Sequence, residues 1–275
     1  MGRVTKIVGL KACSLVTAIR KPTGVPILAY HAIDDSGSYL STSPLVFEAE
    51  MACLKRMECI GISISRIMSM VQGEEEIPPK TVGLTFDDGL YNFIGSAWPT
   101  IRDTGFSATV YVPTNFVGGA SEWYSDYGLS PQPMLSWDDL RRLRDDGVDI
   151  QSHGCAHRHL TTLGATELSH ELEQSREMLR SRLEVNIDHF CYPFGDFDGA
   201  VKAAAVACGY QSAVTTRPGR FRDDDDPFEI KRESLDMVTL EDRETAARVM
   251  TACVHGSYSL YINARDALRR LLGTR

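Results

Sequence analysis

The chain is poor in several features that mark particular classes of protein. No apolar run after the first twenty residues is long enough to cross a bilayer, and no internal repeat or low-complexity tract is present. The seven cysteines are an odd number without a Cys-x-x-Cys pair, which argues against a disulfide framework or a structural zinc knuckle. Acidic residues outnumber basic ones, and the net charge of −8 argues against sequence-independent binding of nucleic acid.

The composition is typical of a globular α/β protein. The 275 residues are 43% hydrophobic and 24% charged, so they can bury a core, and one α/β barrel would account for the length. We therefore expect a single domain over residues 25–275 after an N-terminal arm, residues 1–24. Residues 7–19 are fairly apolar, but Lys11 interrupts them and no cleavage site clearly follows, so we expect an amphipathic helix or an arm. These features and the cysteine usage favour a cytoplasmic location.

Short apolar segments alternate with helical patterns along the chain. This alternation predicts parallel strands joined by crossover helices. The expected strands cover residues 26–30, 81–86, 108–112, 148–151, 188–192 and 212–215, and the expected helices cover residues 44–60, 98–103, 137–146, 166–183 and 200–208.

Candidate functional side chains follow four of the expected strands. They are His31, the pair Asp87-Asp88, the histidines of the HGCAH string (His153 and His157), and the Pro193-Phe194-Gly195 turn. Because the carboxyl ends of parallel strands meet at one end of the fold, we expect these groups to converge. Each has a plainer interpretation, since Asp-Asp-Gly is common in turns and two histidines four residues apart occur as an ordinary core or surface pair.

The residue types suit metal-assisted hydrolysis. One carboxylate and two imidazoles with the spacing of a metal site leave an open position for water or substrate, and the adjacent carboxylate can act as a base. The same donor set accepts zinc, cobalt, nickel or iron, so the residues leave the metal open.

The order TFDDG, HGCAH, YPFG resembles the polysaccharide deacetylase family (carbohydrate esterase family four, with the nodulation-deacetylase homology fold) from about residue 25 to residue 232. The resemblance implies a distorted (β/α)7-type barrel, one divalent metal ion, most often zinc, and hydrolytic removal of N-acetyl groups from an amino sugar in a poly- or oligosaccharide. It implies that Asp87 is the general base, that Asp88, His153 and His157 are the metal ligands, and that the Phe194 amide stabilises the oxyanion.

Two departures from the family pattern indicate one branch. The family's usual Arg-x-Pro-Tyr/Phe motif reads Cys191-Tyr192-Pro193-Phe194 here, so the arginine that orients the catalytic aspartate is missing. The usual C-terminal Leu-x-His is also absent, although His255 lies near the end of the chain. Instead, Tyr30-His31 is similar to the N-terminal motif of a circularly permuted branch that deacetylates exopolysaccharides, which implies that His31 is the acid that protonates the leaving amine.

The expected partner is an N-acetylated saccharide. Trp123, in a long loop, has a face on which a sugar ring could stack, and Tyr192 and Pro193 are further candidate substrate contacts. Two alternatives stay open: hydrolysis of another amide, such as a formamido-sugar or an imide, and a non-catalytic sugar-binding role. Because most relatives act on extracellular or envelope polymers, a secreted location stays open beside the cytoplasmic one, and the oligomeric state is not readable from the residues.

Overall fold

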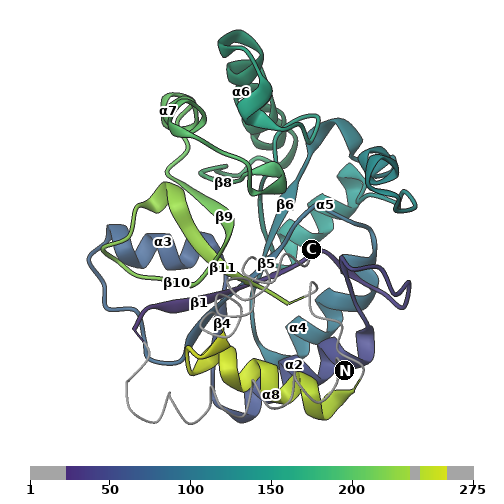
Figure 1. Cartoon of the computed structure of the whole chain (residues 1–275), viewed down its shortest axis with the longest axis vertical. Helices are drawn as coiled ribbons and strands as arrows, with labels where there is room; N and C mark the ends of the chain where they lie inside the picture. The colour runs from purple at the N-terminus through teal and green to yellow at the C-terminus, as the bar shows by residue number, and fades with distance from the viewer. Residues whose placement is uncertain (1–22, 236–241, 259–275) are drawn as a thin grey trace, which may run out of the picture.

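The structure of the chain is a computed structural model that describes residues 23–235 and 242–258. The helix or arm expected over residues 7–19 lies outside these residues. Within them, no helix combines the length and the apolar character needed to cross a membrane. The predicted alternation of strands and helices is confirmed, and Figure 1 shows the strands at the centre of the molecule with helices around them.

Seven parallel strands close into a barrel, which confirms the predicted fold class. β1 (Val25–Tyr30) pairs with β5 (Thr81–Phe86) on one side and with β11 (Ile230–Ser234) on the other, and this pairing closes the ring. The remaining strands follow from β5 in the order β6 (Thr109–Val112), β7 (Asp149–Ser152), β8 (His189–Cys191) and β9 (Ser212–Pro218). The ring is distorted because β7 and β8 share only the pair Ser152 and Phe190.

Shorter strands extend this barrel. β4 (Ile60–Ile62) pairs with the first half of β5, and β10 (Arg220–Phe221) runs antiparallel to the start of β1. β2 (Ala32–Ile33) and β3 (Ser41–Thr42) form a separate two-stranded ladder in the loop that follows His31.

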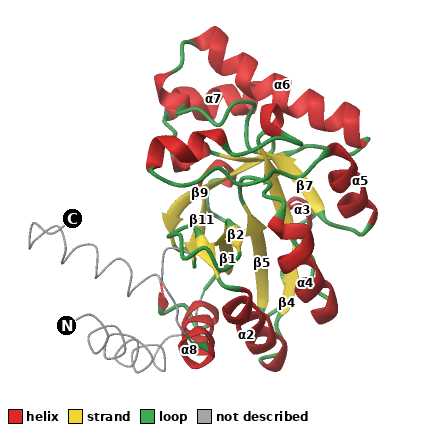
Figure 2. Cartoon of the chain, turned by 90° about the vertical axis from the view of Figure 1, so that its right-hand side faces the viewer, coloured by secondary structure: helices red, strands yellow, loops and turns green. Residues whose placement is uncertain are grey.

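Helices follow most of the barrel strands and pack around them, as Figure 2 shows. They are α2 (Pro44–Arg56), α3 (Ile64–Gln72), α4 (Trp98–Thr104), α5 (Trp137–Asp145), α6 (Ala165–Leu183), α7 (Gly199–Ala207) and α8 (Arg243–Val254). Side chains cap several of them. Ser136 accepts a hydrogen bond from the Asp139 amide while the Asp139 carboxylate accepts one from the Ser136 amide, so α5 begins with a capping box.

The helix predicted over residues 44–60 is shorter in the structure. It ends at Arg56, and Glu58 then adopts a positive φ of 58° before the chain enters β4. A three-residue strand is too short for its periodicity to be visible in the sequence. The elements α3, β11 and α8 were also absent from the prediction, and β11 carries a residue of the site described below.

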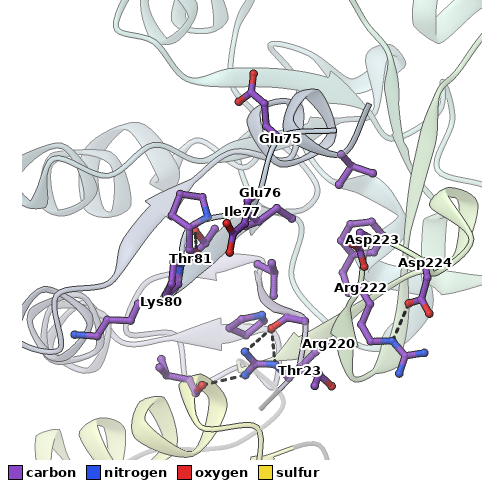
Figure 3. A pocket seen from close by; sticks show the side chains of 18 of the residues that line it. Thr23, Glu75, Glu76, Ile77, Lys80, Thr81, Arg220, Arg222, Asp223 and Asp224 are labelled. Carbon is purple, nitrogen blue, oxygen red and sulfur yellow. Dashed lines mark hydrogen bonds and ion pairs between the residues drawn. The ribbon is translucent and has the colours of Figure 1, made fainter. Parts of the chain in front are cut away.

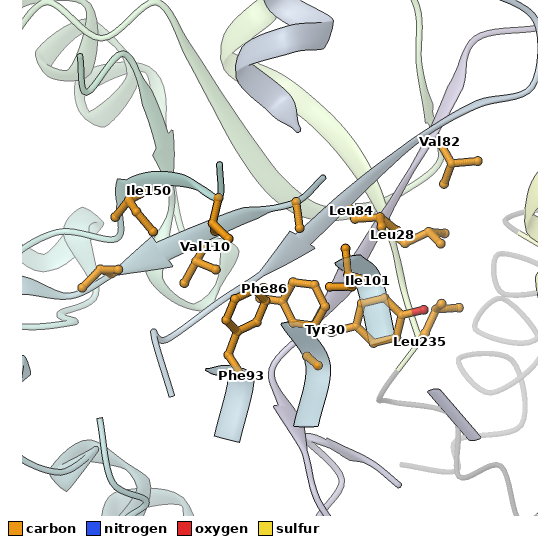
Figure 4. Close-up of a cluster of buried hydrophobic side chains, with 14 of the residues drawn as sticks. Leu28, Tyr30, Val82, Leu84, Phe86, Phe93, Ile101, Val110, Ile150 and Leu235 are labelled. Atoms are coloured by element: carbon orange, nitrogen blue, oxygen red, sulfur yellow. The ribbon is translucent and has the colours of Figure 1, made fainter. Parts of the chain in front are cut away.

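Two hydrophobic clusters occupy the two faces of the barrel strands. Along β1, Leu28 and Tyr30 belong to the cluster shared with the outer helices, while Ile27 belongs to the second cluster, because successive side chains of a strand point to opposite faces. Figure 4 shows Tyr30 stacked on Phe86, with ring centroids 5.2 Å apart. Since Tyr30 precedes His31 and Phe86 precedes Asp87, this packing anchors two of the strand ends that carry the site.

Candidate active site

Asp88, His153 and His157 converge at the carboxyl ends of β5 and β7. The Nε2 atoms of His153 and His157 lie 3.4 and 3.2 Å from Oδ1 of Asp88, and all three side chains are buried. Asp88 and His157 hold positive φ angles of 69° and 48°, a conformation that non-glycine residues adopt at a cost of order 1–3 kcal/mol and that clusters at functional sites.

This group fits a divalent metal ion. Oδ1 of Asp88 is buried and has no hydrogen-bond partner among the described residues, although two imidazole nitrogens face it. One ligand atom from each of the three residues lies within 4.8 Å of the others. A cation between them would satisfy the buried carboxylate oxygen, which is costly to leave unpaired. One carboxylate and two imidazoles form a donor set that zinc and neighbouring transition metals accept.

Neighbouring groups orient these ligands. Nδ1 of His153 lies 2.8 Å from the Cys191 carbonyl oxygen, and because a carbonyl can only accept, Nδ1 carries a proton, which leaves Nε2 as the nitrogen of the neutral ring that can bind a metal. The Tyr124 hydroxyl donates to Oδ2 of Asp88 at 2.7 Å. Trp123 stacks on the His157 ring with centroids 4.4 Å apart and also packs against Phe116. It is only 8% exposed, so little of its face is open to a sugar.

Glu171 on α6 contacts the loop between His153 and His157. Its Oε1 accepts a hydrogen bond from the Ala156 amide. Glu171 also lies against Gly154, so a side chain at position 154, where φ is +79°, would have little room. Sequence patterns place Glu171 within a strongly charged helix, where a buried glutamate is not distinguishable from its exposed neighbours. Its contribution is visible only once α6 is packed against β7.

Asp87 is held by an arginine that the sequence analysis did not identify. Arg232 on β11 donates from Nη1 to Oδ1 and from Nη2 to Oδ2 of Asp87, both at 2.7 Å. The same guanidinium donates to the Thr215 carbonyl and to the Thr85 hydroxyl. Arg232 is 1% exposed. A bidentate contact between a guanidinium and a carboxylate fixes both the position and the plane of the carboxylate.

The charge of Arg232 also controls the ionisation of Asp87. Burial acts to raise the pKa of Asp87, but the charge and hydrogen bonds of Arg232, with smaller contributions from His31 and His153, outweigh it and lower the pKa to about 2. Asp87 is therefore a carboxylate at every pH near neutrality. Arg232 thus contacts Asp87 although the Cys191-Tyr192-Pro193-Phe194 motif has no arginine. The Cys191 sulfur lies 3.4 Å from both Asp87 Oδ2 and Arg232 Nη2.

The pairing of β11 with β9 is irregular beside Arg232. Ile230 pairs with Val214 and Arg232 pairs with Pro218, so two residues of β11 are matched to four of β9. Such irregularities redirect side chains and are frequent beside active sites. The signal available in the sequence was one arginine in a five-residue segment that already held a lysine and a glutamate. Arg232 lies two residues after the buried Ile230 and therefore on the same face of β11, but the sequence analysis did not identify this segment as a strand.

His31 lies at the same end of the barrel, whereas His255 does not. Nε2 of His31 is 4.0 Å from Oδ2 of Asp87, and its side chain is 20% exposed. His255 instead lines a cavity at the amino ends of β1 and β5. Figure 3 shows Thr23 and Thr81 in the lining of this cavity. At that end Arg220 donates hydrogen bonds to carbonyl oxygens before β1 and at the end of α8. This placement supports the choice of His31 over His255 as the candidate acid.

The turn after β8 brings Phe194 beside the ligand group. Phe194 has a φ of +60°, and its ring lies 4.5 Å from that of His157. Tyr192 and Pro193 are buried, and Tyr192 stacks on Phe197 while its hydroxyl donates to the Phe228 carbonyl oxygen. The structure therefore favours a packing role for these two side chains, in which they shape the turn rather than contact a substrate.

Comparison with known proteins agrees with this arrangement. The sequence profile described as polysaccharide deacetylase matches residues 74–213, which is just over half of the chain. The chain belongs to the polysaccharide deacetylase family. It is therefore a hydrolase of the type that acts on carbon–nitrogen bonds of N-acetylated sugars, and the matched segment contains Asp87, Asp88, His153, His157 and Phe194.

Individual relatives agree in sequence and in fold. The chain is 26% identical over 212 residues to YxkH of Bacillus subtilis (strain 168), which is provisionally named a polysaccharide deacetylase, covering 77% of this chain and 71% of the relative. It is 22% identical to the poly-β-1,6-N-acetyl-D-glucosamine N-deacetylase of Escherichia coli (strain K12), over 71% of this chain but only 34% of that longer protein.

Among solved structures, a polysaccharide deacetylase from Bacillus cereus has a TM-score of 0.68 at 27% identity, covering 82% of this chain and 69% of that chain. IcaB from Ammonifex degensii has a TM-score of 0.71 at 19% identity, covering 85% and 98% of the two chains, and this likeness shows the shared fold.

Proposed function

We propose that this protein is a metal-dependent N-deacetylase that removes acetyl groups from an amino sugar in a poly- or oligosaccharide. The observation that carries the proposal is the buried convergence of the candidate ligands Asp88, His153 and His157 with the ionised Asp87 on one side. Relatives named as deacetylases of N-acetylated polymers support the substrate class. The molecule that this protein binds would then be its N-acetylated saccharide substrate.

In the proposed mechanism Asp88, His153 and His157 hold the metal. When bound there, a divalent cation makes water more acidic and polarises the acetamide carbonyl. Asp87 accepts a proton from the attacking water, and Arg232 keeps its carboxylate in place while it does so.

Two further groups act on the acetamide. The backbone N–H of Phe194 donates a hydrogen bond to the oxyanion that forms at the former carbonyl oxygen. His31 donates a proton to the sugar nitrogen, the carbon–nitrogen bond breaks, and acetate and a free amine leave. His31 and Asp87 are close enough to share one bound acetamide, since 4.0 Å separates Nε2 from Oδ2.

The test combines metal content with turnover. Elemental analysis of the purified full chain should find about one divalent ion per chain in the wild type and in Asp87→Asn, and little in Asp88→Ala. Acetate release from oligomers of N-acetylglucosamine should fall at least about 100-fold in Asp87→Asn and in His31→Ala, the usual range for loss of a general base or acid. His255→Ala is the matched histidine control and should behave as the wild type.

Two results would overturn the proposal. One is metal-loaded wild type that releases no acetate from any N-acetylated saccharide of a panel containing oligomers of different linkage. The other is near-normal turnover in Asp87→Asn. Including N-formylated sugars and a cyclic imide in the panel separates N-deacetylation from hydrolysis of another amide at the same site.

A further inference from the structure

Three side chains that the proposed mechanism does not use form a connected chain at the rim of the site. The Tyr127 hydroxyl lies 3.1 Å from Nε2 of His159, and Nδ1 of His159 lies 3.3 Å from Oδ2 of Asp196. The Thr161 hydroxyl donates to the same Asp196 oxygen at 2.6 Å. We call Tyr127, His159 and Asp196 the rim triad.

The rim triad is assembled from three separate loops. Tyr127 ends the 3₁₀ segment Glu122–Tyr127 in the long loop after β6, His159 follows the HGCAH string, and Asp196 follows the Pro193–Gly195 turn. Tyr127 is 46% exposed and the His159 side chain 47% exposed. Exposed polar contacts contribute little to stability, and ordering long side chains costs entropy, so stability alone does not account for this arrangement.

The rim triad adjoins the reaction centre through Phe194. The His159 ring stacks on Phe194 at 4.0 Å and 17°, and the Tyr127 ring lies 5.3 Å from the same side chain. Phe194 in turn contacts the candidate metal ligand His157. A saccharide whose acetamide reaches His157 and the Phe194 amide therefore has its next sugar residue within reach of the rim triad.

The chemistry of the rim triad suits a sugar ring. An aromatic face packs against the apolar C–H face of a sugar, while polar tips satisfy its hydroxyl groups. The Asp196 carboxylate can only accept, which favours a proton on Nδ1 of His159, and Nε2 of His159 shares a hydrogen bond with the Tyr127 hydroxyl. The Tyr127 oxygen keeps lone pairs that can accept a hydrogen bond from a sugar hydroxyl.

We propose that the rim triad is a saccharide-binding subsite for the sugar residue next to the one that is deacetylated. This inference rests on the proposed function, and it extends that function by making the enzyme selective for oligomers over monosaccharides. Tyr127 supplies both the stacking face and the hydroxyl acceptor, and His159 and Asp196 keep it oriented before the polymer binds.

Binding and turnover test the subsite separately. Titration calorimetry of the chelator-treated full chain compares N-acetylglucosamine with its tetramer, and acetate release gives kcat/KM for both probes with the metal-loaded protein. The wild type should prefer the tetramer. Tyr127→Ala should weaken tetramer binding about tenfold and lower the tetramer-to-monomer ratio of kcat/KM by a similar factor, while its metal content stays near one ion per chain.

Further variants assign the contributions within the rim triad. Tyr127→Phe keeps the ring and loses the hydroxyl, so its tetramer affinity should fall between those of the wild type and Tyr127→Ala. Asp196→Ala should weaken tetramer binding by releasing His159. His170→Ala, which removes an exposed histidine on α6, is the matched control and should leave both measurements unchanged.

The outcomes separate the two proposals. A wild type that binds both probes equally, or a Tyr127→Ala variant that keeps the wild-type tetramer affinity and the wild-type ratio, refutes the subsite. If the wild type releases no acetate but its tetramer binding still depends on Tyr127, the subsite stands and the deacetylase proposal fails.

Discussion

The buried pair of Asp87 and Arg232 leads to a prediction about stability that can be worked from the structure. The pKa of Asp87 is about 2 in the folded protein against an ordinary value of 3.8. A lowered pKa of this size is equivalent to about 2 kcal/mol of stability, which is present above pH 4 and is lost as the pH falls through 2. Burial alone would shift the pKa of Asp87 the other way, so this stabilisation depends on Arg232.

Replacing Arg232 by methionine leaves Asp87 buried without its partner. Removing one member of a buried ion pair costs about 3–5 kcal/mol, a large part of the 5–15 kcal/mol that is typical of a folded domain. In Arg232→Met the largest remaining influence on Asp87 is burial, which acts to raise its pKa, so the folded variant should take up a proton at a higher pH than the wild type. Its deficit in unfolding free energy should therefore be larger at pH 7.5 than at pH 5.

Urea unfolding of chelator-treated protein, followed by circular dichroism at pH 7.5 and pH 5, measures this difference. The same substitution in an Asp87→Asn background is the control, and there the pH dependence of the deficit should disappear. Arg232→Lys retains the positive charge without the bidentate contact and should lose less stability than Arg232→Met. This variant keeps the test usable if Arg232→Met does not fold. A deficit that is equal at both pH values, or equally pH-dependent without Asp87, would refute the reasoning.

Two other predictions concern the loops that shape the site. Glu171→Ala removes the acceptor of the Ala156 amide behind the histidine loop, so metal affinity should fall about 10–100-fold in a competition titration against a chelator, with Glu171→Gln nearer the wild type. Gly195→Ala would place a Cβ 2.0 Å from the Thr216 hydroxyl at a φ of +68°, so thermal unfolding should show a loss beyond the ~1–2 kcal/mol of a left-handed alanine. Adding Thr216→Ala to Gly195→Ala should recover the part of the lost stability that is due to the clash. A double variant no more stable than Gly195→Ala alone would contradict this explanation.

Several elements of the fold could be predicted because their signals are local. The strand over residues 81–86 matches β5, since a short, bounded apolar run followed by Asp-Asp-Gly identifies a buried strand and the turn after it. The convergence of the candidate metal ligands could be predicted for a related reason. Asp88, His153 and His157 follow strands that run in parallel, and parallel strands bring their carboxyl ends together whatever the details of packing.

Other elements depended on contacts between distant parts of the chain. Arg232 lies 145 residues from Asp87, and the closure of the barrel through β11, a strand absent from the prediction, brings the two side chains together. Trp123 is a prediction that packing made less favourable. Its aromatic ring suggested a surface on which a sugar could stack, but the ring packs against His157 and is only 8% exposed.

The residue types and their order were therefore enough to predict the group of side chains that could hold a metal ion, because residue identity and strand-end position are local properties. Tertiary structure alone decided which cation holds Asp87, which histidine lies beside it, and how Tyr127, His159 and Asp196 meet at the rim. Each of these outcomes depends on the closure of the barrel, which brings loops from separate strands to one end and places His255 at the other.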